Sequence, residues 1–188
     1  MMLARVPWTA AAKYAAGACA ASFTVTQTTD CDTIRRRLTP IGRFALLSET
    51  RDAPSVPGVL LELGGAPLSS KDLEQALATH VAPASSRLRS RVDVDALEFV
   101  EDLTAEEARP VVMEARPTMD LARTIAKVLD LPLRGTLEKR PWWEVLVWPR
   151  TSGTDILLRT HHCIADGASF GALFGNLSDQ RAEIEALL

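Results

Sequence analysis

The fold is decided by residues 155–167, which have the sequence DILLRTHHCIADG. The first six residues form a short, mainly apolar run, which predicts a β-strand. Two adjacent histidines, His161 and His162, follow at the end of this strand. Because side chains alternate between the two faces of a strand, only one of them can face a cleft, and the other must be buried or structural.

The segments on either side of residues 155–160 predict a β-hairpin followed by a helix. Residues 143–148, WEVLVW, predict a strand that ends at Pro149, and Ser152-Gly153 supplies the turn. Beyond the histidines, apolar residues recur with helical spacing from about Ala168. We expect Trp142, Trp143 and Trp148 to pack the hairpin against helices, because strand side chains alternate inward.

The upstream segments alternate between strand and helix signals, which predicts an α/β fold. Residues 59–63 are expected to form a short, largely buried strand. A helix should begin after a capping box of Ser69 and Asp72, with Leu68 and Leu73 as a hydrophobic staple, and should end at Pro83. Two more helices are expected, one beginning near Thr104 or Ala105 and one over residues 118–129. His80 is expected to be a surface or boundary residue.

Length and composition set the class of protein. The chain has 188 residues, 47% of them hydrophobic, and a net charge of −3, which indicates one globular domain and argues against nucleic-acid binding. Three scattered cysteines predict neither a disulfide framework nor a zinc site. Residues 1–37 carry five basic and two acidic residues, and we expect a weakly structured N-terminal extension or organelle-targeting segment. The folded domain is expected over residues 38–188.

The histidine segment supplies groups suited to acid–base chemistry. A histidine is a good general base near neutral pH, because its unperturbed pKa is about 6.5. Asp166 could anchor the turn through an arginine or by capping the next helix, and Gly167 permits a tight backbone. Three alternatives compete with a general base: a metal site of His161, His162, Asp166 and Cys163, a Cys163 nucleophile, or two structural histidines. We favour the general base and expect no metal.

Several motifs together resemble one known family. Residues 161–167 match the HHxxxDG signature of the CoA-dependent acyltransferase superfamily. Leu133 with residues 140–144 (RPWWE), the opening residues 38–49 (LTPIGRFALLSE) and residues 59–92 resemble the N-terminal half of wax ester synthase/diacylglycerol acyltransferases. The resemblance covers about residues 38–180. Gly42 stands near the usual aspartate of that family, and Trp142 replaces its usual leucine.

This resemblance implies a fold and a reaction. The fold would be a chloramphenicol-acetyltransferase-like two-layer half-domain, a mixed sheet with helices on one side, and we expect the C-terminal half to be absent from this chain. The reaction would transfer a long-chain acyl group from acyl-CoA, as co-substrate, to diacylglycerol or a fatty alcohol, with no permanently bound cofactor. His162 would be the general base and His161 its support. Asp166 would hold the loop, and Gly167 would keep it tight.

The resemblance also bears on partners, location and alternatives. It implies a second half-domain or homo-oligomer, and a cytoplasmic or peripheral membrane location, including lipid droplets. A non-catalytic half-domain that binds a partner or lipid is the alternative, as is a condensation-type enzyme of another HHxxxDG family. An exposed apolar face would indicate where another half docks. Arg87, Arg89 and Arg91 are expected on one face of an extended strand, as a solvated basic face rather than a site for CoA phosphates.

Overall fold

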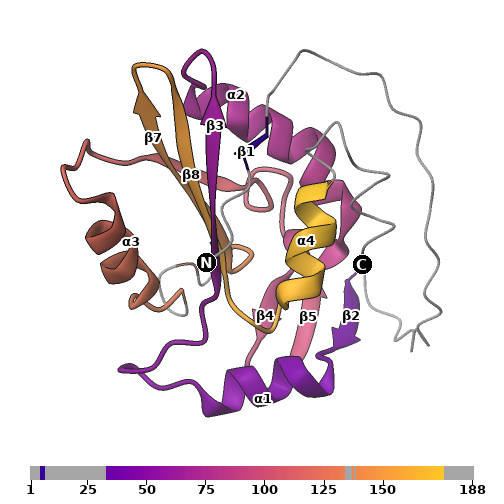
Figure 1. Cartoon of the computed structure of the whole chain (residues 1–188). Helices are drawn as coiled ribbons and strands as arrows, with labels where there is room; N and C mark the ends of the chain where they lie inside the picture. Colours follow the sequence, from indigo (N-terminus) through magenta and orange to yellow (C-terminus); the bar gives the residue numbers. More distant parts are fainter. Residues whose placement is uncertain (1–4, 7–32, 134–136, 138, 176–188) are drawn as a thin grey trace.

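The computed structural model describes residues 5–6, 33–133, 137 and 139–175 (Figure 1). Its larger sheet has five strands in the order β1-β3-β8-β7-β6. The bounds are β1 Arg5–Val6, β3 Gly58–Gly64, β8 Gly153–Thr160, β7 Trp143–Arg150 and β6 Val111–Glu114. The two outer strands run parallel to their neighbours and the inner pairs are antiparallel, so the sheet is mixed, as predicted.

The predicted hairpin is confirmed as β7 and β8, and all eight residues of β8 are buried. The turn needs a glycine, because Gly153 has a φ of +149° and a Cβ there would lie 2.2 Å from the carbonyl oxygen of Leu63. The strand β7 runs through Pro149, where we expected it to end. The missing N–H costs little because Pro149 is the second-last residue of the strand.

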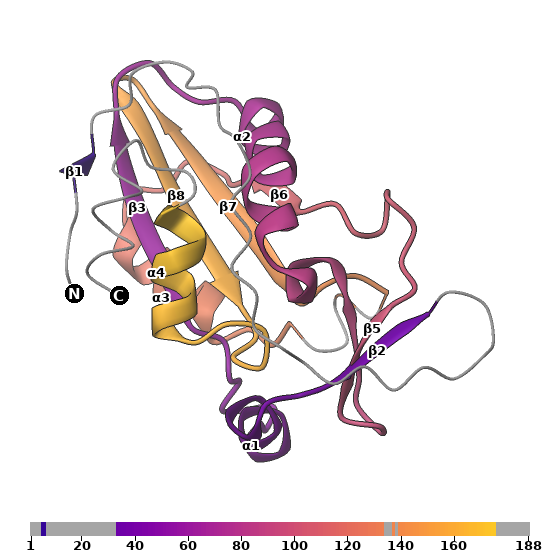
Figure 2. The ribbon, with the colours of Figure 1, turned by 90° about the vertical axis from the view of Figure 1, so that its right-hand side faces the viewer.

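Helices cover both faces of this sheet, and Figure 2 looks onto one face, with α4 in front of the strands. On one face lie α2 (Ser70–Ala76), the π-helical turn η1 (Leu77–Val81) and α4 (Gly167–Gly175). Val81, Leu158 and Leu173 from η1, β8 and α4 line one small apolar cavity there. The helix α3 (Leu121–Leu129) lies on the other face, where it accepts hydrogen bonds from Arg159 of β8. The expectation of helices on one side therefore holds for α2 and α4 and not for α3.

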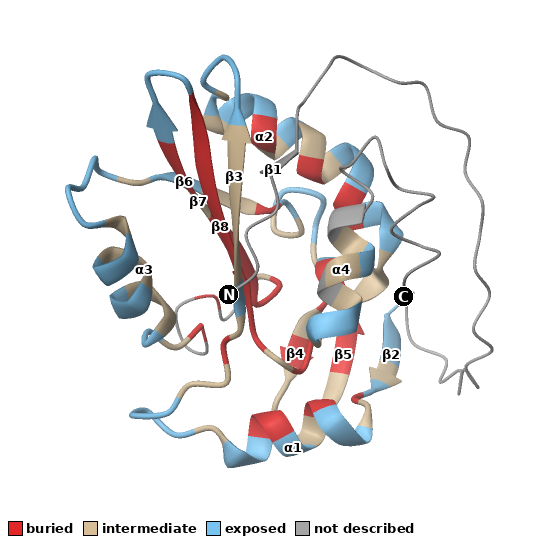
Figure 3. Cartoon of the chain, in the orientation of Figure 1, coloured by how far each residue is buried: buried red, intermediate tan, exposed pale blue. Residues whose placement is uncertain are grey.

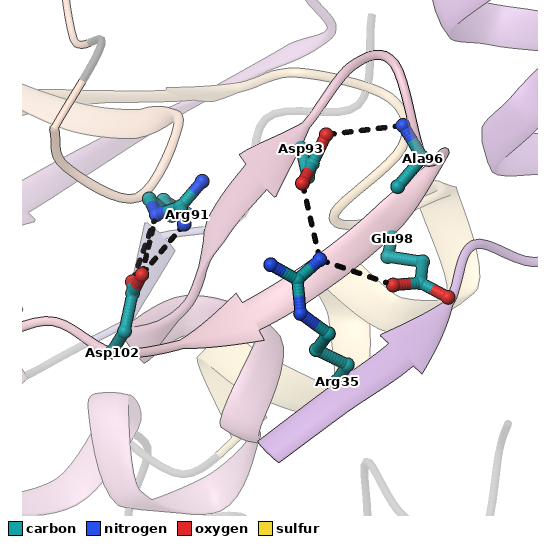
Figure 4. Close-up of polar contacts among 6 residues, drawn as sticks. All are labelled: Arg35, Arg91, Asp93, Ala96, Glu98 and Asp102. Carbon is teal, nitrogen blue, oxygen red and sulfur yellow. Dashed lines mark hydrogen bonds and ion pairs between the residues drawn. The ribbon is translucent and has the colours of Figure 1, made fainter. Parts of the chain in front are cut away.

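The second sheet has three antiparallel strands in the order β2-β5-β4. Their bounds are β2 Ile34–Arg37, β5 Glu98–Glu101 and β4 Arg91–Asp93. Figure 4 shows the ion pairs that join them: Arg35 Nη1 lies 3.1 Å from Asp93 Oδ2, and Arg91 Nη2 lies 2.6 Å from Asp102 Oδ2. The strand β2 thus lies before residue 38, where we expected the folded domain to begin. The rest of the expected N-terminal extension lies outside the described residues, apart from β1.

The capping motifs are correct, but one of them does not begin a helix. Ser69 caps α2 and accepts a hydrogen bond from the Asp72 N–H, and Leu73 is buried. Thr104 and Glu107 exchange the expected capping hydrogen bonds, yet only a single turn follows before β6. The prediction of a helix from Thr104 or Ala105 is therefore wrong. Pro110 lies only six residues after Thr104, and a helix seldom continues past the residue before a proline.

Three further details differ from the sequence-based predictions. The strand β3 is only half-buried along its centre. The helix α3 begins at Leu121, capped by Asp120, and its apolar face is half-exposed. Residues 87–91 are not one extended strand, because Arg87 and Arg89 lie in the 3-10 helix η3 (Ser86–Arg89). His80 is exposed, as predicted. Among the described residues, no helix is long and apolar enough to cross a membrane.

Candidate active site

The histidine pair leaves the end of β8 and is packed against α1 (Pro40–Ser48). A Cβ on Gly42 of α1 would lie 3.2 Å from the carbonyl oxygen of Cys163 and 3.4 Å from its Cα. The glycine therefore permits a close approach of the helix to the loop. Gly42 stands near the usual aspartate of the family that the motifs resemble, and the close approach to Cys163 is a packing reason for a glycine here.

His161 is the buried member of the pair, with no exposed surface. Its Nδ1 accepts a hydrogen bond of 3.1 Å from the Cys163 N–H, and its Nε2 lies 3.3 Å from Glu49 Oε2. Since Nδ1 is an acceptor, the ring proton is on Nε2 and is donated to the Glu49 carboxylate. The Trp142 ring packs edge-on against the imidazole at a centroid distance of 5.2 Å.

His162 lies in the turn after β8 and, unlike His161, is only half-buried, so one histidine of the pair is buried and the other is partly exposed. Its backbone N–H donates to the carbonyl oxygen of Ser55 at 2.8 Å. Its Nδ1 is buried and has no hydrogen-bond partner among the described residues. The residue is therefore not sealed in the core, and its partial exposure is compatible with a general base. The catalytic role of His162 stays a prediction.

Asp166 caps the next helix, which is one of the two roles that the sequence left open. Its Oδ1 accepts a hydrogen bond of 2.8 Å from the Ser169 N–H at the start of α4. The hydrogen bonds from Ser169 lower the pKa of Asp166, and the nearby His162 and Arg87 add smaller effects in the same direction. Gly167 has no positive φ, and a Cβ there would contact nothing within 4 Å. The described chain itself therefore accepts a larger residue at this position.

The alternative nucleophile and metal readings find no support in the geometry. Burial raises the pKa of the Cys163 thiol to about 12, and the charge of Glu49 contributes in the same direction. The thiol is therefore protonated at neutral pH and is a poor nucleophile. Within the described part of the chain, no group of three His, Cys, Asp or Glu side chains lies close enough to hold a metal ion.

The RPWWE segment, residues 140–144, contacts the end of β8 directly. The carbonyl oxygen of Trp142 accepts hydrogen bonds from the His161 N–H at 2.8 Å and from Thr160 Oγ1 at 3.1 Å. The indole N–H of Trp143 donates to the carbonyl oxygen of Leu88 at 2.9 Å. All three tryptophans of the hairpin region are buried, and Trp143 lines the small cavity together with Val81 of η1 and Leu173 of α4, as its predicted packing role requires. This segment therefore belongs to the scaffold of the site.

Sequence reasoning missed a buried ion pair two residues before the histidines. Arg159 Nε lies 2.6 Å from Glu144 Oε1, and both side chains are at most 5% exposed. Arg159 also donates through Nη1 to the carbonyl oxygens of Val128 and Leu131, at 2.6 and 2.8 Å. It therefore links the hairpin to the C-terminal end of α3. The only sequence signal is a charged residue inside each of two apolar strands.

Several solved structures have a similar fold. The first condensation domain of the calcium-dependent antibiotic synthetase aligns with a TM-score of 0.57 and 19% identity over 77% of this chain. The chain has the fold shared by condensation domains and chloramphenicol-acetyltransferase-like acyltransferases. The wax ester synthase/diacylglycerol acyltransferase from Marinobacter aquaeolei VT8 aligns at 0.52 and 22% over 72% of the chain. The trichothecene 15-O-acetyltransferase from Fusarium sporotrichioides aligns at 0.54 and 15% over 84%.

This chain aligns with only part of each of these proteins. The chain spans 37%, 36% and 39% of the three, in the order given. No protein-family model and no curated protein matches the sequence. Condensation domains and two kinds of acyltransferase thus resemble the chain to a similar degree, and the wax ester synthase family is not singled out among them.

Proposed function

We propose that the chain is the N-terminal half of an O-acyltransferase of neutral-lipid synthesis. It would transfer a long-chain acyl group from acyl-CoA to diacylglycerol or a fatty alcohol. The observation that carries the proposal is the partly exposed His162, with an unpartnered Nδ1, at the end of β8 in a fold that acyltransferases share. The choice of lipid acceptor rests on the motifs of residues 38–49 and 140–144 and on the similarity to the Marinobacter enzyme.

In this reaction His162 takes the proton from the acceptor hydroxyl as its oxygen attacks the thioester carbonyl carbon of acyl-CoA. A carbon–oxygen bond forms and the carbon–sulfur bond breaks. The proton held by His162 then passes to the departing CoA thiolate, so that CoA leaves as the free thiol. The buried His161 anchors the end of β8, and Asp166 holds the start of α4, so that the base stays at a defined place.

The direct test is thiol release from palmitoyl-CoA by the purified chain, with hexadecanol, diacylglycerol or no acceptor. The proposal expects release that requires an acceptor, accompanied by formation of the corresponding ester. Release that is equal with and without acceptor would be hydrolysis and would contradict an acyltransferase. An amine acceptor that replaces the alcohol with equal efficiency would instead favour condensation-type chemistry.

A non-catalytic half-domain is the second candidate, and an exposed apolar face of α1 favours it. Ile41, Phe44 and Leu47 are 58%, 73% and 69% exposed and recur every three residues along the helix. Figure 3 shows exposed segments of α1 in pale blue at the bottom of the view, whereas β8 is red and therefore buried. Because the similar proteins are more than twice as long, such a face fits a surface that another half covers. In a pure sample, that half is a second copy of this chain.

We expect the wild-type chain to sediment as a dimer and Phe44→Ser/Leu47→Ser to sediment as a monomer. The physical reason is that the two substitutions remove most of the apolar surface that α1 exposes. Sedimentation equilibrium over a range of concentrations measures the change. The matched control is Met119→Ser, which removes a fully exposed apolar side chain next to α3 and should leave the dimer intact. A wild-type chain that stays monomeric at every concentration would contradict pairing through α1.

A further inference from the structure

The carboxylate of Glu49 lies in the core, directly after α1. Its side chain is only 4% exposed. Oε2 lies 3.3 Å from Nε2 of His161, and Oε1 accepts a hydrogen bond of 3.3 Å from the Ser55 N–H. Both oxygens of this buried carboxylate therefore face hydrogen-bond donors, as a buried charged group requires.

The two contacts of Glu49 lead to the two histidines by separate routes. On one side the carboxylate accepts the His161 ring proton, and Nδ1 of the same ring accepts the Cys163 N–H at 3.1 Å. On the other side the carbonyl oxygen of Ser55 accepts the His162 N–H at 2.8 Å. Two sets of hydrogen bonds therefore fix the backbone of His162. One runs through the preceding residue, His161, and the other through Ser55, and both include the Glu49 carboxylate.

The chain between Glu49 and Ser55 is itself a closed turn. Thr50 and Ala53 exchange backbone hydrogen bonds of 3.3 Å, and Thr50 Oγ1 also accepts the Ala53 N–H at 3.1 Å. The turn brings Ser55 back beside the residue that begins it. Residues 49–55 therefore form a compact unit at the C-terminal end of α1, and the segment that follows β8 is hydrogen-bonded to it.

The hydrogen bonds require a carboxylate at this position and not an amide. A carboxylate accepts at both oxygens, whereas glutamine has one acceptor oxygen and one donor NH₂ group. In Glu49→Gln the NH₂ group must face either the Ser55 N–H or the His161 ring. If it faces the ring, Nε2 must become the acceptor, and the ring proton moves to Nδ1, opposite the Cys163 N–H. Either arrangement breaks one of the two routes.

We propose that Glu49 is a positioning residue that fixes the orientation of His162 through the His161 ring and the Ser55 backbone. It touches no reacting atom. The consequence for catalysis rests on the proposed function, whereas the hydrogen-bond arrangement does not. Neither the motif resemblance nor the sequence periodicity assigned a role to Glu49, since the residue is 112 positions away from His161.

The test is NMR of the full chain labelled with ¹⁵N, in wild type, Glu49→Gln and the control Glu144→Gln. In wild type we expect His161 as the Nε2–H tautomer. In Glu49→Gln we expect a changed His161 tautomer, or exchange of the His162 amide that is about tenfold faster relative to the Leu157 and Leu158 amides. Glu144→Gln makes the same change at another buried carboxylate, the partner of Arg159, and should leave the His161 tautomer and the relative exchange unchanged.

Unchanged tautomer and relative exchange in Glu49→Gln would overturn the proposal, as would equal changes in Glu144→Gln. If Glu49→Gln does not fold, the wild-type spectrum decides, because a ring proton on Nδ1 of His161 contradicts the arrangement. These readouts need no activity, so a chain that fails to transfer acyl groups leaves them intact. In an active chain, Glu49→Gln should lower kcat while the KM for acyl-CoA stays the same.

Discussion

Arg159→Met should lower the free energy of unfolding by about 3–5 kcal/mol. The substitution leaves the Glu144 carboxylate buried without its partner, since both side chains are at most 5% exposed. It also removes the donor to the carbonyl oxygens of Val128, in the last turn of α3, and of Leu131, just beyond that helix. A buried charge without a partner costs far more than the methionine side chain recovers by packing.

Urea denaturation followed by tryptophan fluorescence measures this change. The double variant Arg159→Met/Glu144→Leu is expected to regain much of the lost stability, because it removes both charges together. Arg35→Met serves as the matched control, since its ion pairs with Asp93 and Glu98 lie at the surface, and its effect should be much smaller. A single Arg159→Met variant as stable as wild type would show that the pair does not link the hairpin to α3.

His162→Gln should lower acceptor-dependent thiol release by about 10²–10⁴-fold, the usual contribution of a general base. Glutamine keeps a polar side chain of similar reach, but it cannot take a proton from the acceptor hydroxyl. The backbone hydrogen bond from residue 162 to Ser55 is retained, so the fold should not change. Steady-state kinetics with palmitoyl-CoA and hexadecanol measures the effect, which should fall on kcat.

The control for this variant is His80→Gln, which makes the same change at an exposed histidine in η1. Its activity should equal that of wild type, and both variants should have the wild-type circular dichroism spectrum. A His162→Gln enzyme with wild-type kcat would assign the proton transfer to another group. Because this prediction needs an active chain, the variants are measured after the wild-type chain has shown acceptor-dependent thiol release.

Much of the fold could be predicted where the signal is local. The hairpin of β7 and β8 follows from two apolar runs and the Ser152-Gly153 turn, and Gly153 indeed has a positive φ. The Ser69 capping box begins α2 because its hydrogen bonds join residues only three apart. The Thr104 motif shows the limit of such signals, since the same capping bonds form there without a helix. Capping bonds stabilise a helix start, and the following residues decide whether a helix continues.

The candidate site could be predicted in part for the same reason. The sequence predicted that one of the two adjacent histidines is buried and the other is not, and the structure buries His161 and leaves His162 partly exposed. The sequence left two roles open for Asp166, and only the position of the Ser169 N–H in α4 decided for capping. The basic residues 87–91 were expected on one strand face, but packing places Arg87 in η3, over the ring of Phe99.

The sequence by itself therefore determined the hairpin, the capped start of α2 and the histidine pair at a strand end. Each depends on residues within a few positions, where backbone geometry allows few alternatives. Only the tertiary structure decided that α3 lies on the opposite face and that Glu49 and Ser55 brace the histidines. These contacts join residues far apart in the chain, and burial makes them necessary, because a charged group removed from water must find its partners wherever the fold brings them.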